Sequence, residues 1–79
     1  MTQRLILFYT PSDPVCIKVL EFMKSKSIFV PLRDIEQNPD YRLQLEQAGG
    51  KAQVPCLFID GGPLYDPDTI IRWLGENYF

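Results

Sequence analysis

The chain has no histidine among its 79 residues. Because imidazole is the commonest general base and a leading transition-metal ligand in proteins, its absence argues against zinc chemistry and against histidine-dependent catalysis. A cluster of basic residues is also missing, since 8 basic and 10 acidic residues are spread along the sequence and give a net charge of −2. We therefore expect no metal cofactor and no nucleic-acid partner.

Long hydrophobic runs and an export signal are absent as well. The apolar stretch at residues 5–9 is too short to span a membrane, and no small-residue cleavage pattern follows it. We therefore expect a cytoplasmic protein with no membrane partner. The sequence has only two cysteines, Cys16 and Cys56, which without an export signal favours reduced thiols over a structural disulfide.

The composition predicts one compact domain that spans residues 1–79. Hydrophobic residues make up 46% of the sequence, a proportion typical of a globular chain with a hydrophobic core and not of a disordered or fibrous one. A chain of this length is long enough for a single core. Any function therefore has to be carried by that one unit.

Two short apolar segments predict strands in the first half of the chain. Residues 5–9 form a continuous apolar run followed by the turn residues Thr10-Pro11-Ser12, a pattern typical of a central strand. Residues 28–32 predict a second, interrupted strand. Pro31 within it favours the edge of a sheet, because proline has no backbone N–H to donate.

A proline, four apolar residues and a glycine pair predict a buried strand that leads into a hairpin. The strand covers residues 56–59, after Pro55, and the pair Gly61-Gly62 supplies the positive φ that a two-residue turn requires. Residues 63–65 are expected to return as an edge strand, since they begin with a proline.

Three prolines that follow an aspartate or asparagine mark the starts of three helices. The side-chain oxygen serves as the N-cap, and proline is favoured at the first helical position. The helices are expected at residues 14–26, from Pro39 to the pair Gly49-Gly50, and from Pro67 onward. The apolar residues expected to face the core are Cys16, Val19, Leu20 and Met23 in the first helix, Tyr41, Leu45 and Ala48 in the second, and Ile70, Ile71, Trp73, Leu74 and Tyr78 in the third.

The resulting order is βαβαββα, an α/β fold with a four-stranded mixed sheet and helices on both faces. Together with residues 8–16 and Gln53-Val54-Pro55, this order resembles the glutaredoxin branch of the thioredoxin fold. Residues 54–74 are also similar to the end of the N-terminal domain of glutathione transferases. The resemblance covers virtually the whole chain.

The resemblance implies a glutathione groove around Pro55. In both families the matching proline is cis, and the backbone of the preceding residue, here Val54, pairs with the cysteinyl part of glutathione. Many glutaredoxins have a lysine at the position of Thr10 that reaches the glycine carboxylate, so Lys51 or Gln53 would have to replace it.

The start of the third helix implies the other end of this groove. Asp66 matches an acidic residue that transferases place near the γ-glutamyl amino group, and Asp66 also has a purely structural interpretation as an N-cap. Pro67 stands where the usual serine would be. The γ-glutamyl carboxylate would therefore depend on the backbone N–H groups of Asp68 and Thr69 at the helix start.

The catalytic motif is where the sequence departs from the resemblance. The glutaredoxin motif is Cys-Pro-x-Cys, and the matching residues here are Asp13-Pro14-Val15-Cys16. Asp13 thus replaces the nucleophile, although a carboxylate there is also what a plain N-cap needs. Cys16 matches the resolving cysteine, but it lies on the apolar helix face. Cys56 opens a buried strand, so both thiols are expected to be reduced and buried, without a disulfide between them.

The sequence therefore predicts a pseudo-enzyme of the glutaredoxin type. Its groove would bind glutathione or an extended thiol peptide, with a protein segment as another candidate partner, because backbone pairing is open to any extended peptide. The alternative is a weak thiol–disulfide oxidoreductase that uses Cys16 or Cys56. A transferase is less favoured, because the sequence does not encode the second, helical domain of that family.

Overall fold

The computed structural model describes residues 4–77 and has the expected element order βαβαββα. The four strands form one sheet in the order β2-β1-β3-β4. β1 pairs in parallel with β2 and antiparallel with β3, which in turn pairs antiparallel with β4, so the sheet is mixed as predicted. The strands are β1 (Leu5–Tyr9), β2 (Leu32–Asp34), β3 (Cys56–Ile59) and β4 (Gly62–Leu64).

Each helix begins at one of the prolines that the sequence indicated. Asp13 accepts a hydrogen bond from the Val15 N–H at the start of the first helix, and Asn38 accepts one from Asp40 at the second. Gly50 closes the second helix in the left-handed conformation, with φ +92°. The helices are α1 (Pro14–Ser25), α2 (Pro39–Gly49) and α3 (Pro67–Asn77).

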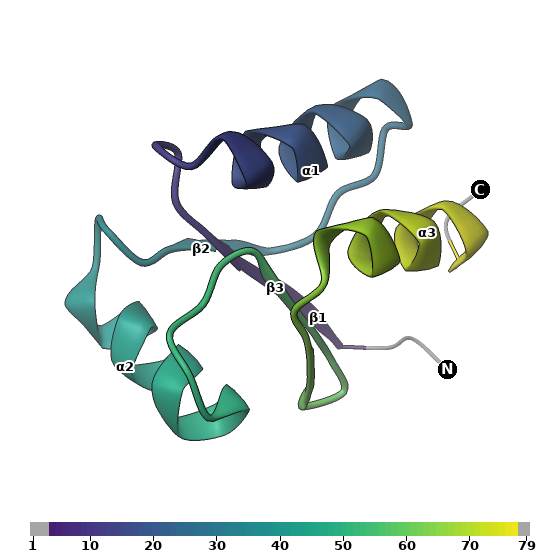
Figure 1. The fold of residues 1–79 in the computed structure, drawn as a ribbon. Coiled ribbons are helices and arrows are strands. Elements are labelled where there is room, and N and C mark those ends of the chain that lie inside the picture. The colour runs from purple at the N-terminus through teal and green to yellow at the C-terminus, as the bar shows by residue number, and fades with distance from the viewer. Residues whose placement is uncertain (1–3, 78–79) are drawn as a thin grey trace.

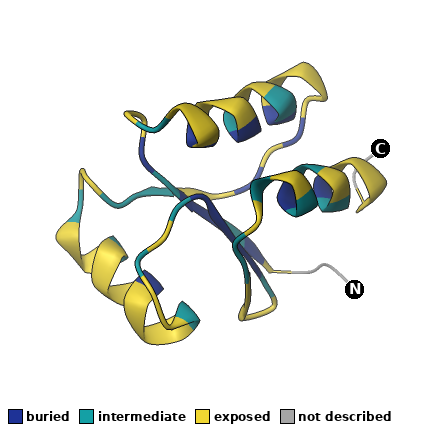
Figure 2. Cartoon of the chain, in the orientation of Figure 1, coloured by how far each residue is buried: buried dark blue, intermediate teal, exposed yellow. Residues whose placement is uncertain are grey.

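The helices cover both faces of the sheet, as expected. Figure 1 shows α1 and α3 side by side on one face and α2 on the other, and Figure 2 shows that their buried residues face the strands. The core accordingly has two parts. The part between the sheet and helices α1 and α3 consists of Leu5, Leu7, Val19, Met23, Ile28, Val30, Leu57, Ile70 and Leu74. The part between the sheet and α2 consists of Phe8, Leu45, Cys56 and Phe58.

The prediction of a strand at residues 28–32 was wrong in its bounds, because the strand begins later in the sequence. The strand is β2, and Leu32 is its first residue, paired with Leu7 of β1. Before it, Ile28 and Val30 are buried, whereas Phe29 is 86% exposed. The segment passes the end of α1 with the side chains of Ile28 and Val30 directed inward, so its pattern resembles that of a strand. Residues 28–30 nevertheless form no part of the sheet. β2 does lie at an edge of the sheet, as Pro31 indicated.

Phe29→Ser should leave the free energy of unfolding within about 0.5 kcal/mol of the wild-type value, because an exposed side chain contributes little to folding. Urea denaturation followed by circular dichroism measures it. A loss of more than about 1.5 kcal/mol, typical of a buried aromatic residue, would contradict this placement.

The hairpin is shifted by one residue from the prediction. Asp60 and Gly61 have positive φ values of 52° and 87°, and Gly62 already pairs with Ile59 as the first residue of β4. The turn is therefore Asp-Gly, whose two positive φ values suit the twist of a hairpin. Ala48, which was expected to face the core, is exposed, and Tyr78, for which the same was expected, lies outside the described residues.

Candidate functional site

The register of the sheet brings the predicted site residues to one end. Phe8 of β1 pairs with Cys56 of β3, so the chain that leaves β1 at Thr10 runs beside Val54 and Pro55. Leu57 pairs with Leu64, and β4 therefore delivers the start of α3 next to the same loop. The loop before α1, the loop before β3 and the start of α3 thus meet along a shared edge.

Asp13 occupies the N-cap of α1. Its Oδ1 accepts the Val15 N–H at 2.9 Å, and its carbonyl oxygen accepts the N–H of Ile17 at 3.0 Å. The side chain is half-buried. The structure thus bears out the capping interpretation, and it places a negative charge at the positive end of the helix dipole.

Cys16 lies one turn into α1 and is fully buried with a free thiol. Burial raises the pKa of this thiol, a backbone hydrogen bond with Thr10 partly offsets the effect, and the negative charge of Asp13 raises the pKa further. Since the thiolate is the nucleophile in exchange reactions, these surroundings disfavour the reactive form of Cys16.

Cys56 is also free and fully buried, at the start of β3. Burial raises its pKa to about 11, even though hydrogen bonds with the Leu64 backbone and the Tyr65 hydroxyl and the positive charge of Lys51 act in the opposite direction. The prediction of two reduced and buried cysteines is therefore confirmed.

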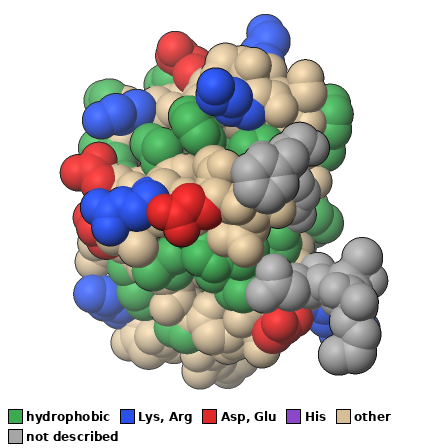
Figure 3. All heavy atoms as spheres, turned by 90° about the vertical axis from the view of Figure 1, so that its right-hand side faces the viewer, with side chains coloured by type: hydrophobic (Ala, Val, Ile, Leu, Met, Phe, Trp, Pro, Cys, Tyr) green, Lys and Arg blue, Asp and Glu red, His purple; other side chains and the backbone are tan. Residues whose placement is uncertain are grey.

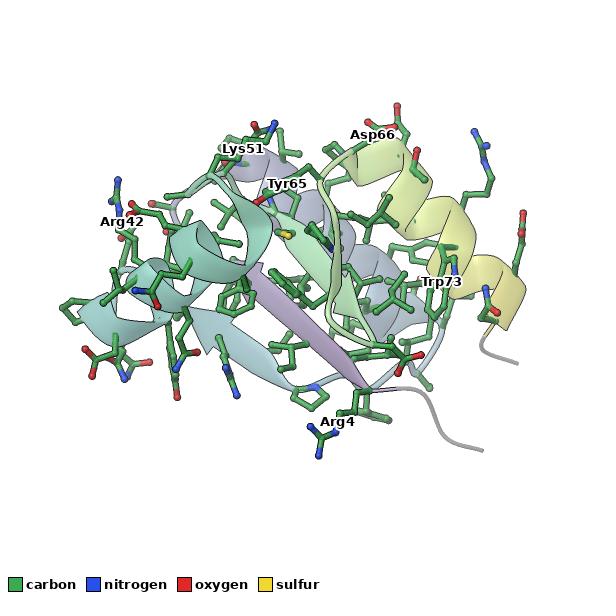
Figure 4. The ribbon with its side chains drawn as sticks, turned by 90° about the horizontal axis from the view of Figure 1, so that it is seen from below. Arg4, Arg42, Lys51, Tyr65, Asp66 and Trp73 are labelled. Carbon is green, nitrogen blue, oxygen red and sulfur yellow. The ribbon has the colours of Figure 1, made fainter. Side chains whose placement is uncertain are left out.

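Lys51 is held over Tyr65 beside the loop that leads into β3. The Lys51 Nζ lies 4.6 Å from the centroid of the Tyr65 ring, and the Tyr65 hydroxyl donates to the Lys51 carbonyl oxygen at 2.9 Å. Figure 4 shows the two residues next to each other, with Asp66 beyond them at the start of α3. No sequence motif singles out Tyr65, because these contacts depend on how α2 and β4 pack.

The loop residues Gln53, Val54 and Pro55 run from the surface into the core. Gln53 is exposed, Val54 is half-buried against the part of the core between the sheet and α2, and Pro55 is buried. The Val54–Pro55 peptide bond is cis, as the resemblance implies. Among the described residues, no hydrogen bond from another backbone group reaches the N–H or C=O of Val54. One pair of backbone groups is thus available to a ligand.

Asp66 and Asp68 are exposed at the start of α3. The Asp66 carboxylate accepts the Thr69 hydroxyl at 2.5 Å, and its carbonyl oxygen accepts the Ile70 N–H at 2.9 Å, which fits the capping interpretation. Asp68 Oδ1 lies 3.9 Å from the Nζ of Lys18 on α1. Because both partners of this ion pair are largely exposed, it contributes little to stability.

Glu36 is a site residue that sequence reasoning missed. It follows β2, and its carboxylate accepts hydrogen bonds from the hydroxyls of Thr10 and Ser12 in the loop before α1. These two hydrogen bonds lower the pKa of Glu36. No motif marks the residue, because its partners lie more than twenty positions away in the sequence.

Charge elsewhere on the molecule is dispersed. On the face shown in Figure 3, acidic and basic side chains alternate among hydrophobic and polar ones. Within residues 4–77, no three histidine, cysteine or acidic side chains gather as they would around a metal ion. Over the same range, none of the helices combines the length and the apolar character needed to cross a lipid bilayer.

Solved structures share the fold over nearly the whole chain. A thioredoxin-like protein matches with a TM-score of 0.75 and 22% identity over 91% of this chain and 96% of its own. The holo form of a glutaredoxin from Populus tremula x tremuloides matches with a TM-score of 0.70 and 18% identity over 94% of this chain and 76% of its own. A diazinon-metabolizing glutathione S-transferase from the silkworm Bombyx mori matches with a TM-score of 0.76 and 14% identity, over 94% of this chain but only 38% of the transferase.

Sequence comparison supplies the classification. No curated protein matches the chain. The glutaredoxin family model, however, matches residues 5–63, which contain β1, α1, β2, α2, β3 and the first two residues of β4. This range also includes Asp13, Cys16 and the Val54–Pro55 loop. The chain therefore belongs to the glutaredoxin family.

Proposed function

We propose that this chain is a binding module of the glutaredoxin family, a single domain that has lost ordinary thiol–disulfide exchange. Its groove beside Val54 takes glutathione or another thiol-containing peptide in extended form. The observation that carries the proposal is the position of Asp13, which caps α1 where the family motif has its nucleophilic cysteine. Two reduced thiols fit a reducing compartment, and we propose the cytoplasm.

The binding half of the proposal rests on the backbone of Val54. Its N–H and C=O have no backbone partner among the described residues, and Val54 precedes β3 by two residues. An extended peptide that pairs with these groups adds a short strand segment, a common mode of peptide recognition. Gln53 and Lys51 on one side and Asp66 and Asp68 on the other supply the polar groups that line such a ligand.

The chemical half rests on the three groups that could act as nucleophiles. Disulfide exchange proceeds by attack of a thiolate through a mixed disulfide, so the carboxylate of Asp13 cannot replace a sulfur. Cys16 and Cys56 are fully buried, and burial raises the pKa of each thiol. Neither cysteine therefore compensates for the change at position 13.

Titration of ¹⁵N-labelled protein with S-methylglutathione tests the binding half without thiol chemistry. We expect the amide signals of Val54 and Asp68 to shift together and to saturate. The amide of Glu76, in the last turn of α3, should not shift and serves as the internal control. If the Val54 signal stays unchanged with glutathione and with thiol peptides at millimolar concentration, the groove does not bind this class of ligand.

The alternative of a weak oxidoreductase requires a reactive thiol. Because Cys16 and Cys56 are both fully buried, we expect a thiol reagent such as 5,5′-dithiobis(2-nitrobenzoic acid) to label them only slowly at pH 7.5, and at the normal rate after denaturation. Fast labelling of either cysteine in the folded protein would favour the oxidoreductase. Mass spectrometry of the labelled peptides identifies the residue.

A further inference from the structure

We propose that the groove selects cysteine-containing polypeptide segments with basic or uncharged flanks over free glutathione, and that Glu36 is the residue that sets this preference. The inference rests on the proposed function, because it concerns the ligand of the same groove. It is carried by the position of the Glu36 carboxylate and by the balance of charge around the loop of Val54.

The register of β1 places Glu36 at the groove. On one side of β1, Tyr9 pairs with Asp34, and the Ile35 N–H donates to the Tyr9 carbonyl oxygen at 3.0 Å. Glu36 follows directly. On the other side of β1 the neighbour is β3, which Val54 precedes by two residues. Glu36 and Val54 therefore flank the same end of the same strand.

Two hydrogen bonds fix the Glu36 carboxylate at this end. The hydroxyls of Thr10 and Ser12 both donate to it, so the charge is held against the loop that leads to Asp13. Ile35, the residue before Glu36, packs against the same part of the core as Val54. The carboxylate is thus attached to two segments that border the groove, although it is exposed to solvent.

The charges around the groove are mainly negative. The loop before α1 brings Asp13, the segment after β2 brings Glu36, and the start of α3 brings Asp66 and Asp68. The nearby cations are partly engaged, since Lys18 lies 3.9 Å from Asp68 and Lys51 lies over the Tyr65 ring.

Arg33, the cation of β2, is directed to the α2 face of the sheet, against which Val54 also packs. It lies over the rings of Phe8 and Tyr41 and donates to Gln44 on α2. Arg42 of α2 is paired with Glu46 on its own helix. Both guanidinium groups are thus held by partners on the side of α2. Even with Arg33 counted, the carboxylates of Asp13, Glu36, Asp66 and Asp68 outnumber the nearby cations, which are Lys18, Lys51 and Arg33.

This balance disfavours a ligand with free carboxylates. Glutathione carries two carboxylates and one ammonium group at neutral pH, whereas a cysteine inside a polypeptide has uncharged amides in their place. Charge at the edge of a binding site acts mainly on specificity and on the association rate. A carboxylate of the ligand near Glu36 is repelled, and a lysine or arginine side chain there is attracted.

Four S-methylated probes separate these ligands by NMR titration of the Val54 amide. They are glutathione, glutathione with its glycine carboxylate converted to an amide, acetyl-Lys-Ala-Cys-Ala-Lys-amide and acetyl-Glu-Ala-Cys-Ala-Glu-amide. We expect the lysine peptide to bind most tightly and the glutamate peptide most weakly, with amidated glutathione ahead of glutathione. The differences should shrink at 1 M salt, since exposed charges are screened.

Glu36→Gln removes the charge but keeps an oxygen that accepts from Thr10 and Ser12. We expect this variant to bind the glutamate peptide and glutathione about two- to fivefold more tightly and the lysine peptide more weakly by a similar factor. Glu76→Gln, which removes the same charge in the last turn of α3, is the matched control and should change neither affinity.

The outcomes separate this inference from the proposed function. If none of the four probes shifts the Val54 amide, the proposed function itself is wrong. If the probes bind but glutathione is preferred over the lysine peptide, or if Glu36→Gln and Glu76→Gln behave alike, the groove binds thiol ligands and the assignment to Glu36 is overturned.

Discussion

Asp13→Cys should give the chain a glutathione-dependent disulfide reductase activity that exceeds the activity of the wild-type protein by roughly two orders of magnitude or more. The new sulfur would lie at the start of α1, where Asp13 now accepts the Val15 N–H. The helix dipole and the unpaired N–H groups stabilise a thiolate there, so its pKa should fall below the ~8.5 of a free cysteine. The chemistry would use the restored motif Cys-Pro-Val-Cys.

Reduction of a glutathione mixed disulfide, coupled to glutathione reductase, measures this activity. The thiolate at position 13 attacks the glutathione sulfur and releases the substrate thiol, and a second glutathione then reduces the protein mixed disulfide. Asp13→Ser is the matched control, because serine retains the N-cap and provides no thiol. It should stay as inactive as the wild type.

Two results would contradict the interpretation of Asp13. Strong activity in the wild-type chain would show that another thiol supports exchange. An inactive Asp13→Cys variant that is folded, as judged by circular dichroism, would show that losing the nucleophile is not the only obstacle. Folding has to be checked because replacing the N-cap costs about 1 kcal/mol.

Adding Glu36→Gln should raise the activity of Asp13→Cys with glutathione, since it removes a negative charge beside the groove.

The fold could be predicted because its signals are local. Each helix start is set by a side-chain cap and a proline within two residues, and each central strand is a continuous apolar run. The errors arose where packing decides. Residues 28–32 have the alternation of a strand, yet pairing with β1 begins only at the Pro31 carbonyl oxygen and at Leu32. The hairpin turn moved by one residue because Asp60 adopts a left-handed conformation that the sequence ascribed to Gly62.

The candidate site could likewise be predicted only where its signals are local. Asp13 and Cys16 occupy fixed positions in one short motif, and Val54 and Pro55 occupy fixed positions in another. Glu36 and the contacts of Tyr65 could not be predicted, since they depend on which loops the sheet brings together.

The free energy of unfolding should fall by about 2 to 3 kcal/mol between pH 9 and pH 11 because of Cys56 alone. Burial raises the pKa of this thiol from 9.0 to about 11 in the folded protein. Below pH 9 the thiol is protonated in both states, and its full contribution to stability is present. As the pH rises through this range, the unfolded chain ionises first, and the folded state loses that contribution. Burial of Cys16 acts in the same direction.

Comparison with Cys56→Ala isolates this effect, since the two proteins differ only at position 56. At pH 7 the variant should be less stable by about 1 to 2 kcal/mol, because it loses buried side-chain volume beneath α2. At pH 11 it should be at least as stable as the wild type.

Cys16→Ala is the control and should retain the steep fall above pH 9. Tyr65 is a neighbour of Cys56, and burial and the adjacent thiol both raise its pKa. Urea denaturation at each pH measures the difference in the free energy of unfolding between the wild type and Cys56→Ala. If this difference does not change with pH, Cys56 ionises as readily in the folded protein as in the unfolded chain.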